Sequence, residues 1–221
     1  MKKLAVLVCF IGLAMAGPAS ARLVNFDSIP SHGQPYGAIP SGWASFDWST
    51  DFDWINPAED APRSGYQYGM VSAPNVAFNA SGANVSFQRN PAFELVSFYL
   101  AGAWRNGLEV KVTGMAKGVE VDSTTFTVNA SAPTLETLDW DVNKVTFRSF
   151  GGTSAGYGAD GNQFVMDNLT TLPLSGLSTA FRSVDTVPEA STWALMLLGF
   201  AGLGCAGYRR ATRERAALAA A

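Results

Sequence analysis

Two apolar segments lie near the ends of this 221-residue chain, so the part that folds in water must lie between them. The first apolar segment, residues 4–15, follows Lys2 and Lys3 and precedes the small residues Ala-Ser-Ala at 19–21. This order is typical of a secretory signal peptide. The segment is too short to span the roughly 30 Å of a membrane's hydrocarbon core. We therefore expect residues 1–21 to be a signal peptide that is removed on export.

The second apolar segment, residues 192–208, carries no charged side chain and is followed by four arginines within residues 209–215. At about 1.5 Å per residue it is long enough to form a short transmembrane helix. Basic residues beside a membrane helix stay in the cytoplasm. The sequence therefore predicts a cytoplasmic tail at 211–221 and places the central part of the chain across the membrane.

A short motif, Val187-Pro188-Glu189, precedes this helix, and Arg209 and Arg210 follow it. In this order the three parts closely resemble a PEP-CTERM sorting signal. The resemblance implies that an exosortase-type membrane enzyme cleaves near the motif and releases or transfers the protein. It also implies a cell-surface or extracellular location, in the exopolysaccharide or biofilm matrix of a Gram-negative bacterium.

The signal, residues 187–210, departs from the family pattern in two respects. Ala190 stands where a second proline is usual, and the tail 211–221 is longer than usual. Residues 175–186 form a polar linker between the folded domain and the signal.

The central part of the chain is acidic: between Arg22 and Val187 it has 9 Lys and Arg against 16 Asp and Glu, a net charge of −7. Such a surface has no electrostatic attraction for nucleic acid or anionic lipid. Both cysteines, Cys9 and Cys205, lie in the terminal apolar segments, so the centre has no disulfide and no thiolate metal site.

Short segments of alternating or β-branched residues, separated by Gly, Pro, Asn and Ser, predict an all-β domain at residues 22–174. The pattern favours a two-sheet sandwich, specifically a jelly roll. The pair Asn106-Gly107 predicts a hairpin turn. Strands are expected at residues 23–26, 44–48, 66–71, 84–88, 93–100, 108–113, 119–128, 144–148 and 163–170.

No residue pattern points to an enzyme. The single histidine, His32, lies in a polar loop, and no nucleophile elbow, dinucleotide fingerprint, phosphate loop or zinc pattern occurs in the central part. Two facing carboxylates would suffice for glycoside hydrolysis, and the 16 acidic residues make some close pair unavoidable. We expect a non-enzymatic protein.

An aromatic and acidic segment at residues 43–54 contains Trp43, Trp48 and Trp54. Sugar rings stack on flat aromatic side chains, so the tryptophans are candidate glycan contacts. The alternative is that they pack in the core or beneath an early loop. The aspartates Asp47, Asp51 and Asp53 could chelate calcium through oxygen, although their spacing is not that of an EF-hand.

A second candidate calcium site pairs Asp27, after the first expected strand, with Asp167 in the last. Residues 25–27, 73–79 and 164–169 resemble segments of ectodomains found with such sorting signals, and more distantly of carbohydrate-binding jelly-roll modules. Such modules often join their terminal strands through a calcium ion, and two neighbouring carboxylates would repel each other without one. A solvated acidic surface is the alternative.

The sequence therefore predicts an exported cell-surface or extracellular-matrix protein. The alternatives are a calcium-dependent glycan-binding module and a secreted polysaccharide-acting hydrolase.

Overall fold

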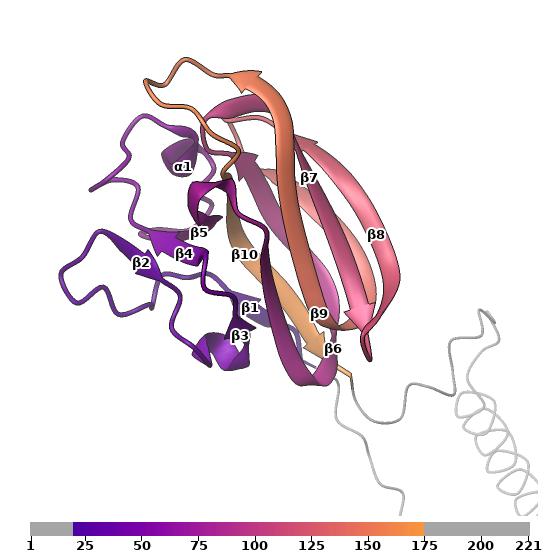
Figure 1. Cartoon of the computed structure of the whole chain (residues 1–221). Helices are drawn as coiled ribbons and strands as arrows, with labels where there is room; N and C mark the ends of the chain where they lie inside the picture. The colour runs from indigo at the N-terminus through magenta and orange to yellow at the C-terminus, as the bar shows by residue number, and fades with distance from the viewer. Residues whose placement is uncertain (1–19, 175–221) are drawn as a thin grey trace, which may run out of the picture. The chain divides into compact units, whose positions relative to one another are not determined.

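The computed structural model describes residues 20–174, which contain the whole of the domain expected at 22–174 (Figure 1). The signal peptide, the linker at 175–186, the sorting motif and the apolar segment at 192–208 lie outside these residues. Within residues 20–174, no helix has both the length and the hydrophobicity needed to cross a membrane.

Strands dominate the described part of the chain, which confirms the all-β class. Two turns of 3-10 helix, Trp43–Ser45 and Ala80–Gly82, and the four-residue α1, Gly65–Tyr68, interrupt them. The strands are β1 Arg22–Val24, β2 Tyr36–Ala38, β3 Asp47–Trp48, β4 Phe52–Ile55, β5 Val76–Asn79, β6 Val85–Gly102, β7 Arg105–Ala116, β8 Val119–Val128, β9 Thr134–Ser154 and β10 Phe164–Pro173.

The ten strands form one antiparallel sheet rather than the two separate sheets that were expected. Its order is β2-β4-β5-β10-β6-β9-β7-β8, with β1 paired to β10 and β3 paired to β6. The difference arises because β6 and β9 are 18 and 21 residues long and pair with neighbouring strands along most of their length. Long shared strands of this kind leave no break at which two sheets could separate.

The sheet curls over its main apolar core. In the strand order β4 and β9 are four positions apart, so they would lie about 19 Å apart in a flat sheet. The ring centroids of Phe52 in β4 and Phe147 in β9 are nevertheless 6.0 Å apart. Distant strands therefore face each other across the core, as the layers of a sandwich do.

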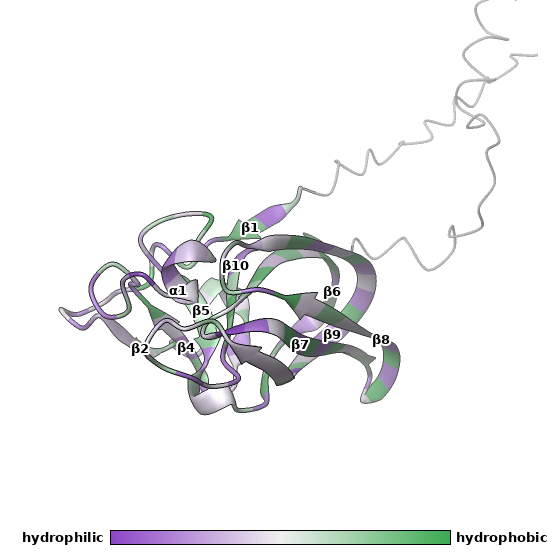
Figure 2. Ribbon diagram, turned by 90° about the horizontal axis from the view of Figure 1, so that it is seen from above, coloured by the Kyte–Doolittle hydropathy of each residue, from purple (hydrophilic) through white to green (hydrophobic). Residues whose placement is uncertain are grey.

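Alternation along β7 shows how the sequence specifies this core. Leu108, Val110 and Val112 are fully buried, while Glu109 and Lys111 between them point to the other face. Figure 2 shows hydrophobic and hydrophilic residues also alternating along the neighbouring strand β8. The strand expected at 108–113 is confirmed.

A smaller apolar cluster lies beneath α1, where a strand had been expected at residues 66–71. The Ser64 hydroxyl accepts a 3.2 Å hydrogen bond from the Tyr66 N–H, which caps a helical turn instead. Gly65 packs against the end of β6, where an added Cβ would collide with the Gly102 carbonyl oxygen. The Tyr66 ring then meets those of Phe78 and Trp104 edge-on.

The hairpin turn expected at Asn106-Gly107 is wrong, because both residues lie within β7. The Asn106 side chain instead accepts a 3.0 Å hydrogen bond from the Ala130 N–H. The tight hairpin is at Lys117-Gly118, between β7 and β8, with φ of 52° and 80°. Positive φ at both positions is the geometry of a type I′ turn.

Candidate functional site

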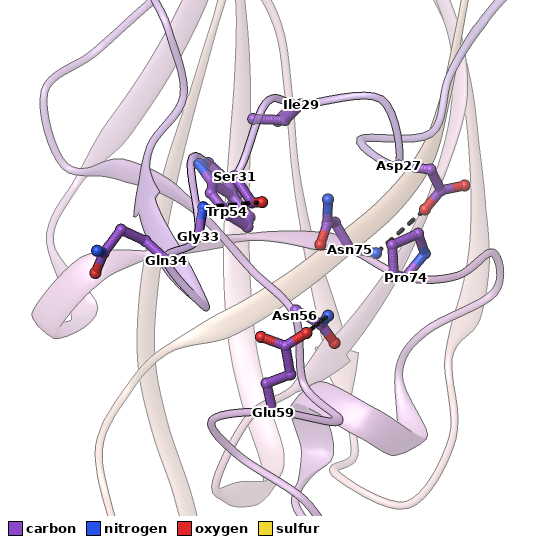
Figure 3. A pocket seen from close by; sticks show the side chains of 10 residues that line it. All are labelled: Asp27, Ile29, Ser31, Gly33, Gln34, Trp54, Asn56, Glu59, Pro74 and Asn75. Carbon is purple, nitrogen blue, oxygen red and sulfur yellow. Dashed lines mark hydrogen bonds between the residues drawn. The ribbon is translucent and has the colours of Figure 1, made fainter.

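A pocket of about 340 Å³ opens among three loops near the start of the domain (Figure 3). The loops come from residues 27–34 after β1, 54–59 at the end of β4, and 74–75 before β5. Segments distant in sequence meet here because β4 pairs with both β2 and β5. The polar residues of its lining are Asp27, Ser31, Gln34, Asn56, Glu59 and Asn75.

Two carboxylates of the pocket hold its loops in place. Asp27 Oδ1 accepts a 3.2 Å hydrogen bond from the Asn75 N–H, and the Asn75 side chain donates to the Phe26 carbonyl oxygen at 3.3 Å. Glu59 Oε1 accepts a 2.9 Å hydrogen bond from the Asn56 side-chain amide. Figure 3 shows both hydrogen-bonded pairs, Asp27 with Asn75 and Glu59 with Asn56, in the lining of this pocket.

A turn at Asn56 positions the loop that follows β4 in the pocket lining. The Asn56 side-chain oxygen accepts from the Ala58 N–H at 3.2 Å, an arrangement that turns the chain directly after β4. The Asn56 N–H donates to the Pro35 carbonyl oxygen at 2.7 Å, which joins this turn to the residues before β2.

A fully buried carboxylate, Asp167, lies in β10, outside the pocket lining. Its Oδ2 accepts hydrogen bonds from the N–H groups of Val71 and Ser72, at 2.8 and 2.7 Å. Its Oδ1 accepts one from the Asn168 N–H at 2.7 Å. Burial, opposed by these donors and aided by the nearby charge of Asp27, raises the pKa of Asp167 to about 6.

The expected calcium pair, Asp27 and Asp167, is therefore close enough to interact electrostatically. Within residues 20–174, no group of three or more His, Cys, Asp or Glu side chains could hold a metal ion. Neutral oxygens lie nearby: the Ser72 hydroxyl is 3.1 Å from Asn168 Oδ1 and 3.5 Å from the Asn25 carbonyl oxygen. These oxygens suit calcium in kind. Both carboxylate oxygens of Asp167 already accept backbone hydrogen bonds, Oδ2 from Val71 and Ser72 and Oδ1 from Asn168.

The three candidate glycan-contact tryptophans lie mainly within the fold. Trp54 is 3% exposed and forms part of the pocket wall. Trp48 donates through Nε1 to the Trp43 carbonyl oxygen at 2.9 Å. Trp43 stacks on Phe26, with ring centroids 5.4 Å apart, and its partly exposed edge lines a shallow hollow. They do not form a flat exposed platform.

Other residues singled out in the sequence, Asp47, Asp51, Asp53 and His32, do not belong to the pocket lining. Asp47 lines a different hollow beside Arg89. Asp53 is half-buried, and burial followed by the charge of Asp51 raises its pKa. His32 is exposed, with φ of 49°, in the loop that contributes to the pocket. The sorting residues Val187, Pro188, Glu189, Arg209 and Arg210 lie outside the described part of the chain.

The structure brings together an aromatic pair, Tyr68 and Tyr157, that the sequence did not predict. The rings of Tyr68 and Tyr157 have centroids 5.5 Å apart, and Tyr68 is 42% exposed. No sequence signal joins them, because they come from α1 and from the distant loop between β9 and β10.

Comparisons with known proteins show distant likeness only. No protein-family model matches the sequence, and no curated protein is significantly similar to it. The cleaved adhesin domain K1 of Lys-gingipain from Porphyromonas gingivalis W83 is 14% identical with a TM-score of 0.40, over 71% of this chain and 99% of that one.

Two further solved structures match at 11% identity. An arabinose-bound α-L-arabinofuranosidase matches with a TM-score of 0.36, over 67% of this chain and 25% of its own. The enzymatically active domain of tailspike protein 4 from bacteriophage CBA120 matches with a TM-score of 0.29, over 60% and 20%. These TM-scores carry no conclusion about function.

Proposed function

We propose that this chain is an exported, non-enzymatic protein of the cell surface or extracellular matrix, delivered by a cleavable C-terminal sorting signal. The proposal rests on the order of its sequence features: a leader at residues 1–21, an acidic domain at 22–174, and the motif, apolar segment and arginines from Val187 onward. An exosortase-type enzyme is its processing partner, and exopolysaccharide is the matrix component it meets.

One observation carries the proposal: every strand of the domain lies within the expected limits of processing. Arg22, the first residue after the expected leader, already pairs in β1 with Thr171 of β10. The last strand ends at Pro173, where the linker to the sorting signal begins. Removal of both ends would therefore leave every strand of the domain intact.

Mass spectrometry of the protein secreted by a host that has the exosortase tests the proposal. The mature form should lack residues 1–21 and everything from about Thr192 onward. A host without the exosortase should retain the C-terminal segment in the membrane fraction. Replacement Ala190→Pro should release the protein at least as fast as the wild type. A secreted chain that keeps Arg209 and Arg210 would contradict the proposal.

A specific observation favours a second candidate, a secreted polysaccharide-acting hydrolase. Two carboxylates, Asp27 and Glu59, line the same pocket, and most glycoside hydrolases use a pair of carboxylates that flank the scissile bond. A reducing-end assay separates the two candidates. Hydrolysis should release new reducing ends, and Glu59→Gln should abolish them, whereas the proposed binding protein releases none.

A further inference from the structure

The pocket between the three loops carries acidic side chains and no basic ones. Asp27 and Glu59 line it, while no Lys or Arg belongs to its lining within the described residues. We propose that this pocket binds an amino sugar with a free, positively charged amine, as in a de-N-acetylated hexosamine polymer. The inference deepens the proposed function, on which it rests for its matrix setting, by naming the class of ligand.

Each pocket carboxylate has one oxygen available to a ligand. Asp27 uses Oδ1 to accept from the Asn75 N–H, and Glu59 uses Oε1 to accept from Asn56. Within residues 20–174, neither Asp27 Oδ2 nor Glu59 Oε2 accepts a hydrogen bond. The bonded oxygens orient the side chains in advance, so little rotamer freedom is lost when the second oxygens accept from an ammonium group.

The charge of the lining selects among sugars. A charge-assisted hydrogen bond from an ammonium group to a carboxylate is about twice as strong as a neutral one. A uronic acid would instead bring a third negative charge beside Asp27 and Glu59 with no lining cation to offset it. An N-acetylated hexosamine keeps the ring but has a neutral amide in place of the cation.

The size and remaining polarity of the pocket fit sugar rings. Its volume of about 340 Å³ is near the lower limit of ligand pockets in proteins, which run from about 300 to 1,000 Å³. Ser31 and Gln34 supply exposed hydroxyl and amide groups on one side. Trp54 also belongs to the lining, but at 3% exposure its indole offers a sugar ring little surface for stacking. One or two sugar units would fill this space.

Isothermal titration of the full-length chain, in mild detergent, with four kinds of oligosaccharide tests the inference. The probes are oligomers of glucosamine, N-acetylglucosamine, glucose and guluronate. The glucosamine oligomers should bind at least about tenfold more tightly than the other three, a difference of about 1.4 kcal/mol. Added salt should weaken this binding, because it screens the exposed part of the charge interaction.

Two variants locate the binding. Glu59→Gln should reduce the affinity for glucosamine oligomers about tenfold, because it removes the charge at an exposed position without emptying the core. Glu120→Gln removes the same charge from exposed β8, outside the pocket lining, and should leave the affinity unchanged. The melting temperatures of both variants should match the wild type, which shows that folding is not the cause.

Several outcomes would overturn the inference: no binding, equal binding to the N-acetylated oligomer, preference for guluronate, equal effects of the two substitutions, or shortening of the glucosamine oligomers during titration. The last outcome would indicate the hydrolase instead. The titration does not depend on processing of the chain. If the sorting proposal fails, a binding result still stands; if no binding is found, the sorting proposal still stands.

Discussion

The backbone N–H of Ser72 donates a 2.7 Å hydrogen bond to Oδ2 of Asp167, which lies 95 residues further along the chain. Val71 donates to the same oxygen. Three residues after Ser72, Asn75 donates its N–H to Asp27. The chain between α1 and β5 is therefore held at both ends by carboxylates, one buried in β10 and one in the pocket.

Lowering the pH from 7.5 to 5 should stabilise the wild-type domain through Asp167. Its pKa is raised to about 6 in the folded protein, so the folded state binds the proton more tightly than the unfolded state does. Stability from this group is therefore present at low pH and is lost as the pH rises through about 6. The gain should be about 1 kcal/mol.

Denaturant unfolding of the wild type and of Asp167→Asn at both pH values measures this effect. The variant should be less stable by about 1–3 kcal/mol at pH 7.5, since an amide nitrogen would face backbone N–H donors. The difference in unfolding free energy between the two proteins should be larger at pH 5, because only the wild type has a group at position 167 that takes up a proton. An identical pH dependence in both proteins would show that Asp167 does not titrate in this range.

Millimolar calcium should raise the melting temperature at pH 7.5 if Asp27 and Asp167 share an ion. Binding to the folded state alone adds about 2.7 kcal/mol at a hundredfold excess of calcium over Kd. For a domain of this size that is a rise of several degrees. Asp167→Asn should remove the rise, and Asp47→Asn, in a separate hollow, should keep it.

The pH dependence of the calcium effect gives an independent check. Calcium requires the ionised carboxylate, so its stabilising effect should fade as the pH drops below about 6. The absence of any shift in the wild type would mean that the acidic residues are held by protein hydrogen bonds alone.

Trp48→Ala should destabilise the domain by about 3–5 kcal/mol, because it removes a large ring from the aromatic core. Its ring centroid lies 5.1 Å from that of Phe52 and 5.2 Å from that of Phe87. Trp48→Phe should cost less, although it loses the bond from Nε1 to the Trp43 carbonyl oxygen. Reduced glycan binding at unchanged stability would instead mark Trp48 as a ligand contact.

The turn at Lys117-Gly118 should respond to substitution through backbone conformation alone. Gly118 has φ of 80° and no atom within 4 Å of an added Cβ. Gly118→Ala should therefore cost about 1 kcal/mol without a steric clash. Lys117→Asn should stabilise by a few tenths of a kcal/mol, since asparagine tolerates the left-handed region better. Thermal unfolding of both variants checks the opposite signs.

The sequence predicted strands best where one face is buried and the other meets water. Along 108–113 the alternation is regular, and the strand lies where it was expected. The sequence predicted two separate strands at 84–88 and 93–100. The structure instead has one strand whose register shifts between Gln88 and Phe93, a place where proline is tolerated.

The sequence predicted only one part of the candidate site, the closeness of the first and last strands. First and last strands were expected to lie side by side, and the pairing of β1 with β10 confirms this. The pocket itself comes from three loops that meet through β2, β4 and β5, three short strands that the sequence did not indicate. No local sequence pattern indicates that loops so far apart in the chain lie side by side in the fold.

The position of β10 has a mechanical consequence for a protein held through its C-terminal end. Tension applied beyond Pro173 enters the domain through β10, a strand with hydrogen-bonded neighbours on both sides: β6 on one, and β1 and β5 on the other. To pull β10 free, a force must break both ladders. A chain anchored through this strand would resist shear from moving fluid better than one whose anchor followed the edge strand β8.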